Sequence, residues 1–214
     1  IATKRALADA RERKVPVRIA VAHDEAKADA LTQLSRRVLL EQKRTWLRYH
    51  DRRCGNLCGL LPLAEGMEVA LTQHIERRSG KGLLRGRRGT IVGWQCDPRE
   101  SAKPSGPSLQ YLPRIVYVRF HDPKCDRASA TGCTSKGGSC VEWQFGDLEP
   151  GVYPIVPRTE DWSVDKPSAK CRGNIKVSRR QLPLTPAGAA TVHSMQGETR
   201  EAGEIAGTRL CSSV

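Results

Sequence analysis

The hydrophobic pattern of this 214-residue chain changes twice, and the order of the changes limits the folds that it can adopt. Up to about residue 58, a strand-like alternation is followed by helix-like spacing. From about Leu60 there are short β-type runs separated by Gly and Pro, and a strand followed by a helix-like segment returns near residue 175. Strand, turn and helix form the unit of an α/β layer fold, whereas short punctuated strands are typical of a small barrel. The order therefore favours one α/β domain with an inserted barrel over three domains in a row.

The first α/β unit has three recognisable parts. Residues 1–14 are helix-prone and charged, and residues 15–23 alternate apolar side chains as a strand does. Asp24 is the expected N-cap of the helix that follows. The buried face of that helix is expected to carry the residues that recur at three- and four-residue spacing, which are Leu31, Leu34 and Val38.

Five central runs have strand character, namely MEVALTQHI, GTIVGW, IVYVRF, VEWQF and VYPIVP. Residues 97–113 and 123–139 are rich in Pro, Ser, Gly and Lys, and we expect them to be loops. A last strand, IKVSRRQLPL, precedes the segment TPAGAATVHSMQG. There we expect Thr185 as a helix N-cap, Pro186 at the first helical position and Gly197 as the helix stop.

Basic charge is concentrated in two places. The chain has 36 Lys and Arg against 23 Asp and Glu, a formal net charge of +13. Residues 76–90 contribute +5 and residues 166–180 contribute +6, so the two stretches account for +11 of the total. Clustered positive charge attracts nucleic-acid phosphates because binding releases condensed counterions. A solvated basic face is the alternative interpretation at this point.

The compartment is inferred from segments that the sequence lacks. No apolar run approaches the roughly 18 residues of a membrane span, and the N-terminus has no signal-peptide pattern. We therefore expect an intracellular protein, in the nucleus or mitochondrion if the source is eukaryotic. Since the chain begins with Ile1 rather than Met, a fragment or a processed product is expected.

Eight cysteines raise the question of a metal site. His121, Cys125, Cys133 and Cys140 form a candidate set of zinc ligands, but their gaps are irregular and no C-x-x-C pair occurs. Free thiols in a reducing compartment fit the composition better. We therefore assign no metal ligand.

The segment QLPLTPAGAATVHSMQGET resembles a motif of superfamily 1B DNA helicases of the RecD and petite-integration-frequency (PIF) type. In this family a Q-[IL]-P-L strand leads into a helix that ends roughly A-x-T-[IV]-H-K-S-Q-G-x-T. The matching positions are Gln181, Leu182, Pro183, Leu184, Ala190, Thr191, Val192, His193, Gln196, Gly197 and Thr199.

A second stretch, GMEVALTQHIERRSGKGLLRGRRGTIVGW, is similar to another pair of motifs of the same family. The family pattern is G-x-x-V-M-L-x-x-N, followed by G-L-x-N-G-x-x-G-x-V-x-G. The matching positions are Gly66, Val69, Leu71, Gly82, Leu83, Gly86, Gly89, Ile91 and Gly93.

This resemblance implies a partial RecA-like α/β fold interrupted by a small SH3-like β barrel. It places residues 1–58 in the first part of the second RecA-like domain, residues 59–174 in the barrel with its long flexible loops, and residues 175–214 in the return to the RecA-like domain. For the full-length parent it implies ATP-dependent DNA unwinding with ATP and Mg²⁺, and roles in DNA repair and recombination. The implied partners are single-stranded DNA and the first RecA-like domain, with no membrane involved.

The resemblance also implies site residues near the C-terminus. Thr191 and His193 would donate hydrogen bonds to phosphates of single-stranded DNA, which fixes position without reading sequence. Four residues would lie towards the nucleotide cleft: Gln196, Gly197, Glu198 and Thr199. The alternative is that His193 is an ordinary helix-end histidine and Gly197 an ordinary C-cap.

Further DNA contacts are expected from the basic stretches. Gly82, Gly86 and Gly89 allow tight turns, so that three arginines would project from a hairpin tip and contact phosphates: Arg85, Arg87 and Arg88. Two more arginines of the second stretch are assigned to DNA binding, Arg179 and Arg180.

Two tryptophans are candidates for stacking on bases, Trp94 and Trp143. A tryptophan at a strand end more often belongs to the core, so both interpretations stay open.

The sequence departs from the family pattern in several places. Ser194 and Met195 stand where the family has Lys-Ser, and Gly188 stands where an aromatic is usual. Residues 200–214 look unrelated to the arginine-bearing motif that follows in the family, so Arg209 is not assigned that role. The chain has no G-x-x-x-x-G-K-[ST] phosphate loop, and RSGKGLLRG does not match one. We therefore expect no catalytic residue, no bound cofactor and no ATP hydrolysis in this chain alone.

Two other functions compete with a helicase part. LLRGRRGTIVGW also resembles the KOW-type turn of small RNA- and ribosome-binding barrels, which would make residues 60–157 a non-enzymatic nucleic-acid-binding module. A zinc-stabilised interaction domain is the third possibility. The match at QLPL and VHSMQG favours the helicase, since a KOW protein has no reason to carry it.

Overall fold

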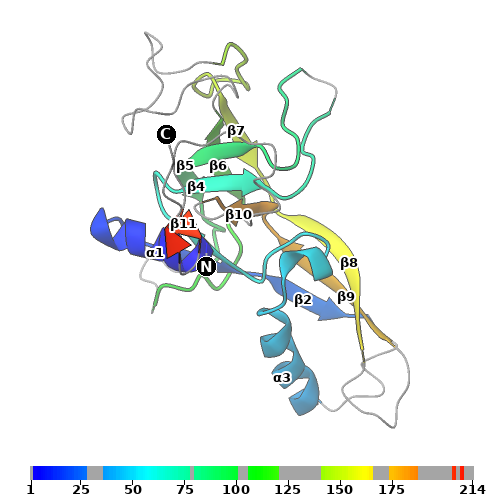
Figure 1. Ribbon diagram of the computed structural model, residues 1–214. Helices are drawn as coiled ribbons and strands as arrows, with labels where there is room; N and C mark the ends of the chain where they lie inside the picture. Colours follow the sequence, from blue (N-terminus) through cyan, green and yellow to red (C-terminus); the bar gives the residue numbers. More distant parts are fainter. Residues whose placement is uncertain are drawn as a thin grey trace.

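The computed structural model describes residues 2–27, 36–77, 80–100, 106–120, 141–165, 174–187, 204–205 and 208–209. These residues form a mixed, sheet-rich α/β fold with a five-stranded sheet, a three-stranded sheet and two-stranded pairs (Figure 1). Within the described ranges, no helix is long and apolar enough to cross a membrane.

The N-terminal segment follows its hydrophobic pattern. Helix α1 (Ala2–Glu12) is followed by strand β1 (Arg18–Val21), which confirms the helix and the strand predicted there. β1 pairs antiparallel with β3 (Leu60–Leu63), with Arg18 opposite Leu63. Ala10 of α1 is buried and belongs to the main hydrophobic core.

The five-stranded sheet is built from the punctuated central runs and one strand from near the C-terminus. Its order is β10 (Leu184–Pro186), β4 (Glu68–Leu71), β5 (Arg88–Gln95), β6 (Ile115–Phe120) and β7 (Val152–Ile155), and every pairing is antiparallel. In β6 the alternation in IVYVRF buries Val116, Val118 and Phe120 in turn, as period-two patterning requires. No closed barrel occurs among the described strands, because β10 and β7 are the two edges of this sheet.

One predicted central strand is wrong. The run VEWQF, residues 141–145, has no strand structure. Its backbone belongs to a loop that closes onto β7, in which Gly151 N donates to Trp143 O at 3.0 Å. Gly146 follows the run directly with a φ of 54°, which turns the chain away from an extended path.

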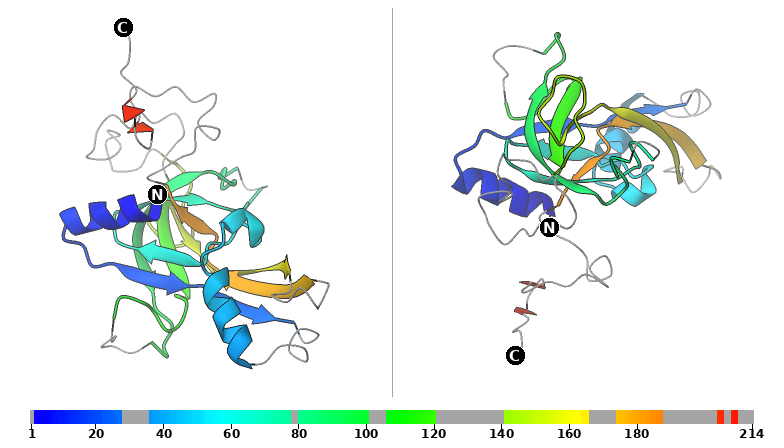
Figure 2. Two further views of the ribbon diagram at one scale, coloured as in Figure 1. Left: turned by 60° about the horizontal axis from the view of Figure 1, so that its bottom comes forward. Right: turned by 90° about the horizontal axis from the view of Figure 1, so that it is seen from above.

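The three-stranded sheet has the order β2 (His23–Ala26), β9 (Asn174–Gln181) and β8 (Arg158–Asp165). Helix α3 (Arg36–Trp46) and the short helix η1 (Asp51–Arg53) lie on the same side of the molecule as this sheet (Figures 1 and 2). A second core of Trp46, Cys54, Trp162, Ile175 and Val177 joins α3 to the sheet. The rings of Trp46 and Trp162 meet edge to face, with centroids 5.8 Å apart.

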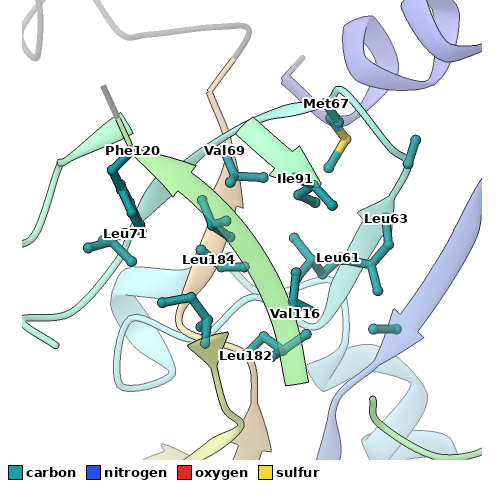
Figure 3. Close-up of a cluster of buried hydrophobic side chains, with 14 of the residues drawn as sticks. Leu61, Leu63, Met67, Val69, Leu71, Ile91, Val116, Phe120, Leu182 and Leu184 are labelled. Atoms are coloured by element: carbon teal, nitrogen blue, oxygen red, sulfur yellow. The ribbon is translucent and has the colours of Figure 1, made fainter. Parts of the chain in front are cut away.

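The main core lies between the five-stranded sheet and the β1–β3 pair (Figure 3). It combines side chains from distant parts of the chain, such as Ala20, Leu61, Val116, Leu182 and Leu184, all of which are buried. The main core therefore joins segments from both sides of residues 58 and 175, where the sequence pattern changes. A last pair of strands, β11 (Glu204–Ile205) and β12 (Thr208–Arg209), is antiparallel.

Two predicted helix caps are wrong. Asp24 is a residue of β2, and its side chain is buried. Thr185 and Pro186 lie in β10, opposite Ala70 and Val69 of β4. Proline is tolerated there because β10 is an edge strand, where a missing N–H interrupts no second ladder. Of the residues predicted for the helix after Asp24, Val38 lies in α3, whereas Leu31 and Leu34 are outside the described residues, as is Gly197.

A buried ion pair connects the elements around the second core. Arg179 of β9 has no exposed surface, and its Nε and Nη2 donate to the two carboxylate oxygens of Asp24, each at 2.7 Å. The same guanidinium donates to Trp46 O at 2.8 Å and to Leu57 O at 3.2 Å. Burial by itself would lower the pKa of Arg179, but the hydrogen bonds and charge of Asp24 raise it above its ordinary value.

Asp24→Asn is expected to destabilise the protein strongly. The substitution keeps the size of the side chain but leaves the Arg179 guanidinium buried without a counter-charge. Removing one partner of a buried pair typically costs about 3–5 kcal/mol, and urea unfolding would measure the loss. The matched control is Asp161→Asn, which removes the partner of Lys27 in an exposed pair. Equal midpoints for the two variants would contradict the account.

Candidate nucleic-acid interface

The loop between β4 and β5 carries most of the first basic stretch, and we refer to residues 72–77 and 80–87 as the basic loop. It folds back on itself, because Ile75 N donates to Leu83 O at 2.9 Å and Glu76 pairs with Leu83 as an isolated antiparallel bridge. Leu83 is fully buried and belongs to the main core. The basic loop is therefore fixed to the body of the protein at its middle.

The glycines of this region have two different roles. Gly86 lies in a turn with a φ of 87°, as predicted, and Gly82 has a φ of 63°, in the left-handed region that favours glycine. Gly89 does not form a turn, since it lies in β5. A Cβ at Gly89 would lie 2.6 Å from Val118 Cγ1 and 2.7 Å from Arg119 O. The glycine is therefore needed for close packing of β5 against β6.

The three arginines predicted for this hairpin differ in exposure. Arg85 is exposed, and its backbone N–H donates to Nδ1 of His74 at 3.2 Å. Arg87 and Arg88 are half-buried, and both are already engaged by other groups. Arg85 thus presents more of its surface to solvent than the other two.

Two arginines that were not predicted as site residues belong to the same surface. Arg158, the first residue of β8, donates from Nη1 to His74 O at 3.0 Å and from Nη2 to Ile75 O at 3.4 Å. Arg77 is exposed, and within the described part of the chain it has no carboxylate partner. The charge of residues 76–90 already pointed to Arg77. No motif contains Arg158, so its position became evident only when β8 was seen to begin beside the basic loop.

Arg179 and Arg180 point to opposite faces of the three-stranded sheet, as successive strand residues do. Arg180 is exposed, and it pairs in register with His23 on one side and Thr159 on the other. Arg179 is fully buried against Asp24. A side chain without exposed surface does not reach a phosphate in this conformation, so the DNA contact predicted for Arg179 does not fit the structure.

Both tryptophans considered for base stacking pack on the core. Trp94 and Trp143 are half-buried and contact the main core. The Trp143 ring also meets Tyr153 edge to face at 6.4 Å. These contacts favour the core interpretation over a stacking platform.

The remaining predicted site residues lie outside the described residues. They are the expected DNA ligands Thr191 and His193 and the expected nucleotide-cleft residues Gln196, Gly197, Glu198 and Thr199. The candidate zinc ligands His121, Cys125, Cys133 and Cys140 are also outside them. In the part that the structure describes, no three His, Cys, Asp or Glu residues are grouped to hold a metal ion.

Three cysteines are described, and all are free thiols. Burial raises the pKa of Cys54 to about 11 and that of Cys58 to about 12. Cys58 Sγ donates to Leu184 O at 3.4 Å, whereas Cys96 is exposed. The first two thiols thus serve packing, since a thiol that stays neutral is neither a nucleophile nor a metal ligand.

No family model matches the chain. In sequence, it is 27% identical over 154 residues to the ATP-dependent DNA helicase PIF1 of Danio rerio. The chain is therefore similar in sequence to part of a PIF1 helicase. The match covers 72% of this chain, and it confirms the resemblance indicated by the two motifs.

The chain spans 16% of the length of that relative. Among solved structures, it is similar to the Pif1 helicase of Candida albicans, with a TM-score of 0.46, 17% identity and coverage of 93% of this chain and 36% of the other. It is also similar to a Bacteroides Pif1 bound to ssDNA, with a TM-score of 0.41, 15% identity and coverage of 93% and 32%. Scores below 0.5 establish no shared fold, so the resemblance rests on the sequence.

Cys96 is expected to react with iodoacetamide in the native protein at about pH 8, whereas Cys54 and Cys58 are not. A pKa raised from 9.0 to about 11 lowers the thiolate fraction of Cys54 about a hundredfold, and that of Cys58 is lower still. Mass spectrometry of the alkylated peptides would resolve the three sites. In urea all three should react at similar rates, and labelling of native Cys54 as fast as Cys96 would refute its burial.

Proposed function

We propose that this chain is part of an ATP-dependent DNA helicase of the PIF1 type and that it binds single-stranded DNA through the basic loop. Arg180, which lies on the other face of the three-stranded sheet from Arg158, would be a separate contact. The observation that carries the proposal is the exposure of Arg77 and Arg85 on a loop that is fixed at Leu83 and held by Arg158. The sequence similarity to a DNA helicase supports it independently.

Electrostatic attraction to phosphate drives the proposed binding. Guanidinium groups bind phosphate oxygens through parallel N–H donors, and a loop that is already ordered loses little freedom on binding. Phosphate contacts of this kind position a strand without reading its sequence, as a helicase requires. Arg87 and Arg88 lie in the same basic stretch and add to its positive potential.

Further parts of the proposal concern the organisation of the parent protein. We propose that residues 1–58 and 175–214 belong to a RecA-like domain that an SH3-like insertion, residues 59–174, interrupts. In this arrangement Thr191 and His193 contact the DNA strand. Four residues lie towards the nucleotide cleft: Gln196, Gly197, Glu198 and Thr199. ATP and Mg²⁺ would bind in the parent together with its first RecA-like domain, which supplies the phosphate loop that this sequence lacks.

Arg85→Gln is expected to weaken binding of single-stranded DNA and to flatten its salt dependence. Each lost phosphate contact lowers the log–log slope against salt by about 0.7 for single strands. Fluorescence anisotropy of a labelled oligonucleotide over a series of salt concentrations would measure the slope. The control is Arg114→Gln, an equal loss of charge near the other end of β5, where Arg114 N donates to Gln95 O. A salt-independent affinity, or equal slopes for both variants, would contradict the proposed interface.

The same titration separates the helicase part from a barrel module. The double variant His193→Ala, Gln196→Ala should also lose affinity if the C-terminal motif lies on the DNA path. Wild-type binding by this variant, together with the loss in Arg85→Gln, would leave affinity with the basic loop alone and would favour the non-enzymatic KOW-like module.

A further inference from the structure

A hollow of about 350 Å³ opens beside the basic loop. Three segments that are distant in sequence form its walls: residues 55–56, the basic loop and the beginning of β8. The wall at Gly55 requires glycine, because its φ is 65° and a Cβ there would lie 2.4 Å from Glu160 Cβ. The hollow thus depends on a close approach of the 55–56 segment to β8.

Positive charge dominates the lining of the hollow. Arg77, Arg85 and Arg158 line it, and Glu160 is the one acidic residue among the lining residues. The Glu160 carboxylate accepts a hydrogen bond from Gln73 Nε2 at 3.1 Å. Three positive charges against one negative charge leave a formal excess of two, which favours an anion.

The lining of the hollow also includes a residue with a buried hydroxyl. Thr72 lines the hollow, is 6% exposed, and its Oγ1 has no hydrogen-bond partner among the described residues. Its backbone N–H is already used, since it donates to Pro183 O at 2.9 Å. A buried hydroxyl without a hydrogen-bond partner costs free energy, and a hydrogen bond from the hydroxyl to an anion would remove that cost.

His74 supplies a second neutral donor. Its Nδ1 accepts the backbone N–H of Arg85 at 3.2 Å. In a neutral imidazole this places the ring proton on Nε2, which becomes a donor. The lining thus combines guanidinium groups with two neutral donors and one acceptor that has no partner in the described part of the chain, Gln73 Oε1. Tetrahedral oxyanions are bound by such N–H and O–H donors.

The hollow is organised before any ligand binds. Arg158 donates to the carbonyls of His74 and Ile75, and Gln73 Nε2 donates to Gly55 O at 3.1 Å. These bonds tie the basic loop to both other walls. A ligand would therefore not have to order the site, which favours binding.

We propose that this hollow binds a phosphate group, with the Thr72 hydroxyl, His74 Nε2 and the guanidinium groups of Arg77 and Arg85 as donors. That this phosphate belongs to DNA rests on the DNA-binding function proposed above. The phosphate belongs to a single DNA strand, at its terminus or in its backbone, and inorganic phosphate shares the same chemistry.

The test uses the intact chain and inorganic phosphate as the first probe. In ¹H–¹⁵N NMR spectra, phosphate should shift the backbone amides of Thr72, Gln73, His74 and Arg85, whereas chloride at equal ionic strength should not. Thr72→Val keeps the shape of the side chain and removes the hydroxyl, and it should weaken phosphate binding about fivefold or more. Arg77→Gln changes an exposed side chain and should weaken it to a similar extent, with Arg114→Gln as the matched control.

The second probe identifies the source of the phosphate. Fluorescence anisotropy would compare oligonucleotides of one sequence that carry a 5′-phosphate, a 3′-phosphate or hydroxyls only. Tighter binding of one phosphorylated oligonucleotide, lost in Thr72→Val, would show that the hollow binds a terminal phosphate. Equal affinity for all three, lowered by Thr72→Val, assigns a backbone phosphate.

Two results separate this proposal from the DNA-binding function. If inorganic phosphate shifts the amide resonances of the residues that line the hollow but no oligonucleotide binds, the phosphate site is supported and the DNA-binding function is refuted. If oligonucleotides bind in a salt-sensitive way while Thr72→Val and Arg77→Gln bind both probes like the wild type, the proposed site in the hollow is overturned. Equal losses in Arg77→Gln and Arg114→Gln, with no loss in Thr72→Val, would also overturn it.

Discussion

The buried pair of Arg179 and Asp24 holds together the part of the molecule that the candidate site depends on. One guanidinium bonds to β2 through Asp24, to the end of α3 through Trp46 O and to the segment before β3 through Leu57 O. It also lies 5.4 Å from the centre of the Trp162 ring of β8. Because a buried charge is costly without partners, all of these elements must meet in one arrangement for the guanidinium to be satisfied.

The basic surface follows from that arrangement. Arg158, Glu160 and Trp162 share one face of β8, since they are two residues apart. Trp162 packs in the second core beside Arg179, so the position of β8 also sets where Arg158 and Glu160 stand. Arg158 then donates hydrogen bonds to backbone carbonyls of the basic loop, and Gly55 allows residues 55–56 to lie close to Glu160. Packing in the interior thus determines the geometry of an exposed, positively charged hollow.

Local patterns predicted the local elements and missed what depends on distant partners. The alternation in IVYVRF identified β6, and the charge of residues 76–90 identified the basic loop. Asp24 fits an N-cap by residue type, but its actual partner is 155 residues away, and no local rule contains that information. Thr185-Pro186 likewise reads as a helix start, while pairing with β4 makes it an edge strand. The hollow could not be predicted, because three separate segments form its walls.

The most direct test of the account is photo-cross-linking of a single-stranded oligonucleotide to the intact chain, with the cross-linked peptides identified by mass spectrometry. Cross-links are expected within residues 72–88, with further ones at the exposed face of β9 around Arg180. Cross-links confined to α1 and the exposed face of α3, with none in the basic loop, would contradict it.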